Sequence, residues 1–123
     1  MTRAVKIPDE THPITISPTG THVTVRVGGV TVAETDSALS LREASYPAMQ
    51  YIPLSDVDQR LLRRTQTHTY CPYKGEASYY TVQVPDGPAE TDLIWTYENP
   101  HDAVAQIAGH VAFYPDRAEV TVS

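Results

Sequence analysis

Short runs of alternating apolar and polar residues, ended by prolines and glycines, constrain the fold of this chain most strongly. Valines alternate with polar residues over 23–27 and again over 30–32, and only Gly28-Gly29 separates the two runs. A period of two is typical of a half-buried strand, and two glycines accept the positive φ angles of a tight hairpin turn. The sequence therefore predicts a β-hairpin here.

The same alternation predicts further short strands. They cover residues 38–43, 49–52, 78–84, 94–98, 110–114 and 120–122, and strand character also returns at His68. Ten prolines and six glycines are scattered among these runs, which favours many turns between short strands over a few long helices. We therefore expect a mainly β protein built from antiparallel strands.

Two short helices are predicted between the strands. Ser55, with Asp58 three residues later, resembles a capping arrangement, and the apolar residues that follow have helical spacing, which predicts a helix over about 55–63. Asn99-Pro100 supplies a helix cap and a first-turn proline, and Gly109 stands where a helix would stop. A second helix is therefore expected between these two points.

The 123 residues fit one domain. Residues 1–12 mix charges with proline and show little periodicity, so we predict an N-terminal arm, mobile or forming a first edge strand, before a single β-rich domain over 13–123. No apolar stretch reaches the roughly 20 residues that cross a bilayer, and the start lacks the apolar core of a secretion signal. These features predict a cytoplasmic protein.

Charge and cysteine content narrow the choice of partners. A formal net charge of −6 disfavours nucleic acids and anionic membranes, because both attract positive surfaces. Cys71 is the only cysteine, so the chain has neither an internal disulfide nor the paired thiolates of a structural zinc site. We expect no nucleic-acid partner, no membrane partner, no metal and no other cofactor.

The segment from Asp58 to Glu76 is the first candidate for a functional site. It holds four of the nine Lys and Arg residues, with no carboxylate between its ends. Cys71 is the candidate nucleophile, because a nearby cation such as Lys74 favours the reactive thiolate, provided that the chain turns at Pro72. The alternative interpretations are a small core residue for Cys71 and a solvated helix end for the arginines of this segment.

A second candidate feature is an anion site with aromatic walls. Lys74-Gly75 lacks the glycine-rich run of a phosphate loop, but Lys74 together with Arg42 or Arg64 could hold an anion. The candidate walls and polar contacts are Tyr51, Tyr80, Trp95, Tyr97 and Ser78. Aromatic residues in strands commonly belong to the core, so a core role for these side chains stays open.

The second half of the chain contains three notable motifs, Cys71-Pro72-Tyr73-Lys74-Gly75-Glu76-Ala77-Ser78-Tyr79-Tyr80, Trp95-Thr96-Tyr97 and Ile107-Ala108-Gly109-His110-Val111-Ala112-Phe113-Tyr114. The Cys-Pro-aromatic-Lys-Gly core, the Ser-Tyr after it and the Gly-x-Val-Ala-Phe run rarely occur together by chance. With Glu43-Ala44-Ser45-Tyr46-Pro47 and Tyr51-Ile52-Pro53 before them, they resemble the family catalogued as domain of unknown function 427, over about residues 23–120. The positions that match the family signature are Arg42, Tyr51, Cys71, Lys74, Gly75, Ser78, Tyr80, Trp95, Tyr97, Gly109 and Phe113.

The resemblance implies small, twisted antiparallel sheets that form a compact tent-like or barrel-like β domain. Similar topologies hold zinc through cysteine pairs, which this chain lacks, so a metal is not carried over. A nucleotidyltransferase label is attached to the family, but we find no Gly-Ser followed by paired acids that would support this chemistry from the residues.

Three functional interpretations follow. The leading one is a binding domain for a small molecule or an anion such as a nucleotide, with a pocket around Arg42, Cys71 and Lys74. The second is an enzyme that uses the same pocket for nucleotidyl or acyl transfer. The third is a structural or protein-interaction module without a small ligand, which would show an exposed apolar patch or a two-fold homodimer.

Overall fold

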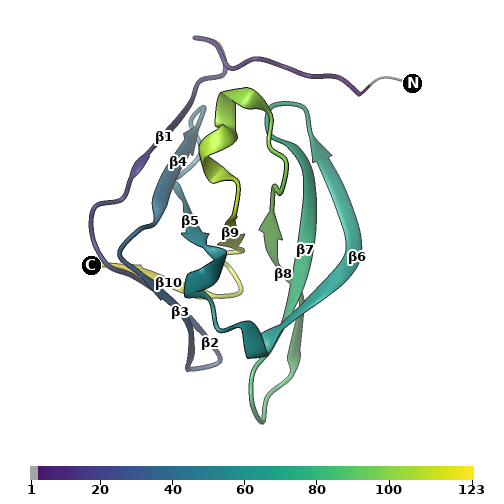
Figure 1. The fold of residues 1–123 in the computed structure, drawn as a ribbon. Helices are drawn as coiled ribbons and strands as arrows, with labels where there is room; N and C mark the ends of the chain where they lie inside the picture. Colours follow the sequence, from purple (N-terminus) through teal and green to yellow (C-terminus); the bar gives the residue numbers. More distant parts are fainter. Residues whose placement is uncertain (1–2) are drawn as a thin grey trace.

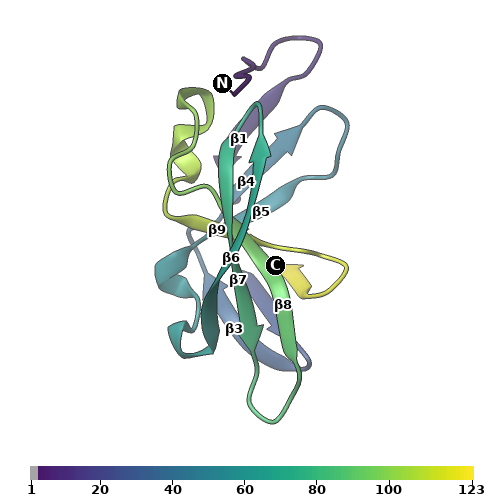
Figure 2. The same ribbon diagram turned by 90° about the vertical axis from the view of Figure 1, so that its right-hand side faces the viewer.

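Residues 3–123 are described by a computed structural model, in which ten strands form two antiparallel sheets (Figures 1 and 2). The first two residues of the predicted arm lie outside the described residues. The strands are β1 (Ile14–Pro18), β2 (Val23–Val27), β3 (Val30–Thr35), β4 (Leu39–Glu43), β5 (Met49–Pro53), β6 (Leu62–Cys71), β7 (Gly75–Gln83), β8 (Ala89–Thr96), β9 (His110–Phe113) and β10 (Glu119–Val122). Three short 3-10 helices join them, namely η1 (Leu54–Asp56), η2 (Gln59–Leu61) and η3 (Asp102–Ile107).

The larger sheet has seven strands in the order β1-β4-β5-β9-β8-β7-β6, and the smaller sheet has the order β10-β2-β3. The predicted mainly β fold is confirmed. Figure 1 shows that the larger sheet curls, so that β1 and β4 stand on one side and β6 and β7 on the other, with the green turn of η3 between them. Within residues 3–123 neither sheet closes into a barrel, because each keeps two edge strands.

The predicted hairpin is confirmed as β2 and β3. Val27 pairs with Val30, and the two glycines between them have φ angles of 56° and 80°. Because L side chains rarely adopt such angles, glycine permits this tight connection. Further along the hairpin, a β-bulge shifts the register between Val25 and Arg26. The inward-facing valines of β2 are fully buried against the larger sheet.

The prediction of an α-helix over 55–63 is wrong. Two 3-10 turns, η1 and η2, take its place, and the chain enters β6 at Leu62. The helix is interrupted because the N–H group of Asp58 donates to the carbonyl of Val32 in β3 at 2.8 Å, which holds Val57 in an extended conformation. Asp58 does act as a cap, because its side chain accepts a hydrogen bond from the N–H group of Arg60, but it caps η2.

The prediction of an α-helix after Asn99-Pro100 is also wrong, since η3 is a 3-10 helix that is kinked at Val104. Val104 and Ile107 are both completely buried. Residues three apart lie on the same face of a 3-10 helix, so this short form is sufficient to bury both side chains. Gly109 ends the segment as predicted, with a φ angle of 75°. None of the helices within residues 3–123 is long and apolar enough to cross a membrane.

The central strands of the larger sheet are buried on both faces. On β9, Val111 and Phe113 pack into the core between the two sheets, whereas Ala112 faces a second core beneath η3. In the same way, Ile52 of β5 packs into the core between the two sheets, and Tyr51 packs into the core beneath η3. Strands of this kind read as nearly continuous apolar runs because neither face meets water.

Candidate functional site

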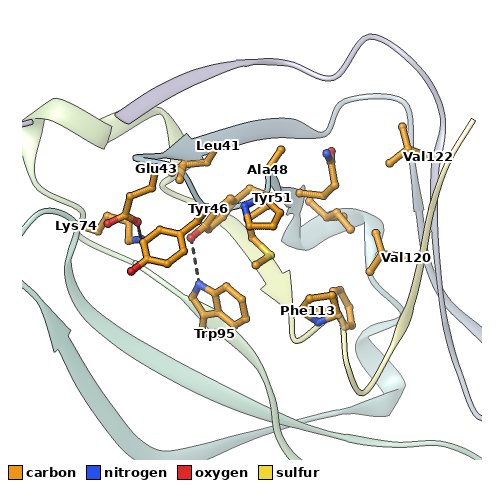
Figure 3. A pocket seen from close by; sticks show the side chains of 15 residues that line it. Leu41, Glu43, Tyr46, Ala48, Tyr51, Lys74, Trp95, Phe113, Val120 and Val122 are labelled. Atoms are coloured by element: carbon orange, nitrogen blue, oxygen red, sulfur yellow. Dashed lines mark hydrogen bonds and ion pairs between the residues drawn. The ribbon is translucent and has the colours of Figure 1, made fainter. Parts of the chain in front are cut away.

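A cavity with a volume of about 540 Å³ runs along β5 (Figure 3). One end is polar and contains Glu43 and Lys74, while the other end is apolar and contains Phe113, Val120 and Val122. The remaining lining residues are Leu41, Tyr46, Pro47, Ala48, Met49, Gln50, Tyr51, Ile52, Trp95 and Pro115. A cavity of this size with few polar groups is typical of a small-molecule site.

The pairing of β5 explains where the cavity lies. β5 pairs with β9 only at Ile52 and Pro53, although it pairs with β4 from Met49 to Tyr51. The first half of β5 therefore has no partner on its β9 side in the described sheet, and side chains of both cores reach this position. The cavity is located at this interruption of the sheet.

An ion pair occupies the polar end of the cavity. Lys74 Nζ lies 2.5 Å from Glu43 Oε1, and the two side chains are only 13% and 17% exposed. His12 Nε2 donates to the other carboxylate oxygen, Oε2, at 2.8 Å. Burial on its own would raise the pKa of Glu43, but the hydrogen bonds from Lys74 and His12 outweigh burial, and the pKa is lowered. Glu43 is therefore ionised at neutral pH.

Aromatic side chains form the wall next to this ion pair. Trp95 Nε1 donates to the hydroxyl oxygen of Tyr51 at 3.1 Å, and the two rings meet edge to face. The Trp95 ring also packs against Tyr114 at a centroid distance of 4.6 Å. Burial raises the pKa of Tyr51 far above its usual range, so this hydroxyl stays neutral. These contacts fix the Trp95 ring in place beside the cavity.

Four of the predicted ligand-binding residues lie together at this site. Lys74, Tyr51 and Trp95 line the cavity, as Figure 3 shows. Tyr97 lies behind them in the core beneath η3, and Lys74 Nζ is 5.8 Å from the centre of its ring, within cation–π range. Burial raises the pKa of Tyr97 as well, so its hydroxyl is also neutral.

Arg42 and Cys71 do not line the cavity. Arg42 is exposed on β4, where alternation turns it away from its neighbours Leu41 and Glu43. The predicted turn at Pro72 is present, since the N–H group of Lys74 donates to the carbonyl of Cys71 at 3.2 Å. The half-buried Cys71, however, packs against the core beneath η3, while Lys74 extends to Glu43.

Ser78 and Tyr80 lie elsewhere on β7. The hydroxyl of Ser78, a residue only 5% exposed, accepts a hydrogen bond from Arg64 at 3.1 Å, and Arg64 also forms a salt bridge with Glu98. His68 Nδ1 is 3.5 Å from the same hydroxyl. Tyr80 is half-buried and packs against the core between the two sheets. Neither residue lines the 540 Å³ cavity.

Several residues of the cavity wall, and one that contacts it, were not among the predicted site residues. Glu43 and Tyr46 belong to the motif Glu43-Ala44-Ser45-Tyr46-Pro47, so a sequence signal for them was present. His12 carried no such signal, because its contact with Glu43 joins residues 31 positions apart. Phe113 matches the family signature but was not among the predicted ligand-binding residues, and it lines the apolar end of the cavity.

The lowered pKa of Glu43 predicts a specific pH dependence of stability. A carboxyl group with a lower pKa in the folded than in the unfolded chain stabilises the fold above its unfolded pKa. That contribution is lost as the pH falls through the folded value. Urea unfolding of Glu43→Gln should therefore differ most from the wild type near neutral pH, and the difference should shrink below about pH 4.

Glu76→Gln is the matched control for this experiment. Glu76 pairs with Arg3, but both side chains are about half exposed, at 48% and 57%. Exposed ion pairs contribute little, so this variant should follow the wild-type curve at every pH. An equal gap between wild type and Glu43→Gln at acidic and neutral pH would contradict the assignment of Glu43.

Within the described part of the chain, no three His, Cys, Asp or Glu side chains are grouped so that they could hold a metal ion. Comparison with curated proteins finds no match. A family model does match, over residues 15–123, and this range includes every residue that lines the cavity. The chain therefore belongs to the family described as domain of unknown function DUF427, or NTP_transf_9.

Proposed function

We propose that the cavity binds a small molecule with an apolar body and one polar group, such as a carboxylate. The observation that carries this proposal is a 540 Å³ cavity with largely apolar walls and a partly buried ion pair at one end only. The aromatic and aliphatic walls would enclose the body of the ligand, and its polar group would face Lys74.

The charges favour a ligand with at most one negative charge. Lys74 is the one Lys or Arg among the described residues that line the cavity, and Glu43 compensates its charge. A nucleoside triphosphate carries several negative charges and would require more cations than this. We therefore prefer a monocarboxylate or a neutral amide over a nucleotide.

The lining residues also favour binding over acyl transfer. No serine, threonine or cysteine is found among the described residues of the cavity wall. The hydroxyl of Tyr51 is already engaged by Trp95 and stays neutral because of burial. Covalent catalysis by a hydroxyl or thiol needs a side chain that an adjacent base can activate, and the described wall has no serine, threonine or cysteine for this role. The amine of Lys74 is held in an ion pair with Glu43.

The fluorescence of Trp95 provides a direct test. Trp95 is the only tryptophan of the chain and lines the cavity, so a bound ligand should change its emission. We would titrate the protein with 2-naphthoate, indole-3-acetate and decanoate, and with the primary amide of each. Decanoate and its amide do not absorb the excitation light, so their binding can be followed by the emission of Trp95. The naphthoate and indole compounds do absorb it, so their binding would be followed by NMR chemical shifts. Saturable binding of at least one of these compounds is expected.

A cavity-filling variant tests whether such binding occurs at this site. Ala48→Phe places a ring into the cavity from its wall and should weaken binding at least tenfold. Ala105→Phe makes the same change at an exposed position of η3 that does not line the cavity, so it should leave binding unchanged. Equal affinities for both variants, or no saturable binding of any compound, would refute the proposal.

A further inference from the structure

The N-terminal arm is fastened to the turn between β6 and β7. The N–H group of Lys6 donates to the carbonyl of Pro72 at 2.9 Å, and the hydroxyl of Tyr70 donates to the carbonyl of Ala4 at 2.6 Å. The Arg3 guanidinium lies 4.6 Å from the centre of the Tyr70 ring. These contacts place the arm, which precedes the matched residues 15–123, next to the polar end of the cavity.

His12 connects the arm to the ion pair. Its ring stacks on Tyr73 at a centroid distance of 4.1 Å and an interplanar angle of 10°. Its Nε2 atom lies 2.8 Å from Glu43 Oε2, and because a carboxylate only accepts hydrogen bonds, Nε2 must donate. The His12 side chain is 26% exposed, so solvent can exchange protons with the ring.

The charge at this end of the cavity depends on His12. With a neutral imidazole, the charges of Glu43 and Lys74 cancel. With a protonated imidazole, the three side chains carry one net positive charge, because Glu43 is shared between two cations. An imidazole changes its charge between about pH 5 and 8, whereas the ammonium group of a lysine does not titrate there.

We infer that His12 is a specificity-determining residue, and that its protonation leaves Lys74 with uncompensated positive charge for a ligand carboxylate. This inference rests on the proposed function. The other titratable or charged groups that face His12 are Asp9, which accepts from the N–H group of His12 at 3.2 Å, and Tyr73. Lys6 lies on the same arm, 5.9 Å from the centre of the Tyr73 ring.

The test compares each carboxylate of the panel with its own amide between about pH 8 and pH 5.5. A carboxylate with an ordinary pKa keeps its charge in this range. The affinity of the wild type for the carboxylate should rise about threefold to tenfold as the pH falls, because one charge is added a few ångströms away in a partly aqueous site. Its affinity for the amide should stay constant.

Two substitutions assign this effect to His12. His12→Gln keeps a neutral N–H donor for Glu43 but cannot take up a proton, so its carboxylate affinity should no longer rise as the pH falls. His22→Gln is the control, because His22 is also paired with carboxylates, Asp36 and Glu34, but does not line the cavity. This control should keep the wild-type pH dependence.

The outcomes separate this inference from the proposed function. If the wild type and His12→Gln gain carboxylate affinity equally as the pH falls, or if the amide shows the same rise, the inference is refuted and the binding function stands. If no panel compound binds to the wild type at either pH, the proposed function fails and the inference fails with it.

Discussion

Lys74→Met is expected to destabilise the protein by about 3 kcal/mol and to abolish carboxylate binding in the cavity. Removing one partner of a buried ion pair leaves the other charge uncompensated, which typically costs about 3–5 kcal/mol. The Lys74 and Glu43 side chains keep 13% and 17% exposure, and His12 still donates to Glu43, so we place the loss at the lower limit. The measurements are urea unfolding and titration with the panel carboxylates at neutral pH.

A second substitution separates the structural role of Lys74 from its role in binding. Lys74→Met combined with Glu43→Gln removes both charges, so most of the lost stability should return, whereas carboxylate binding should not. Lys6→Met is the control, because Lys6 is exposed and does not line the cavity. Unchanged stability of Lys74→Met would show that the ion pair contributes little to the fold, and retained carboxylate affinity would exclude Lys74 as the anchor.

Phe113→Ala is expected to cost about 3–5 kcal/mol, the range for removing a buried phenylalanine ring. Phe113 is only 2% exposed, pairs with Ile94 across the sheet and packs into the core between the two sheets. A domain of this size has about 5–15 kcal/mol of stability in total, so the variant should be close to unfolding at room temperature. Urea unfolding followed by far-UV circular dichroism would measure the loss.

Val122→Ala is the matched control for Phe113→Ala. Val122 lines the same end of the cavity but is 47% exposed, so its truncation should change the free energy of unfolding by no more than about 0.5 kcal/mol. Similar losses for the two variants would mean that the ring of Phe113 is not a central part of the core.

Much of the fold could be predicted because it depends on local patterns. The hairpin of β2 and β3 follows from alternating valines on either side of two glycines, and both signals act within a few residues. The two helices could not be predicted correctly, because contacts distant in sequence decided them. Asp58 bonds to β3, and His101 at the start of η3 donates to the carbonyl of Lys74 at 2.9 Å.

The candidate site was predicted in part. Lys74, Tyr51 and Trp95 were identified by residue type and by the family resemblance, and all three line the cavity. Arg42 was included for its charge, but its place on β4 turns it away from Glu43. Alternation along a strand predicts which residues share a face of the sheet, but it does not predict which face will line a cavity.

The sequence by itself determined the mainly β architecture, the first hairpin and the aromatic and cationic residue types available to a ligand, because these follow from short-range periodicity and side-chain chemistry. Only the tertiary structure decided that Lys74 pairs with Glu43, that His12 reaches the same carboxylate and that a cavity opens where β5 separates from β9. These arrangements join residues that are far apart in the sequence. Strand order decides which side chains become neighbours, and burial shifts their pKa values. No local sequence pattern encodes either of these.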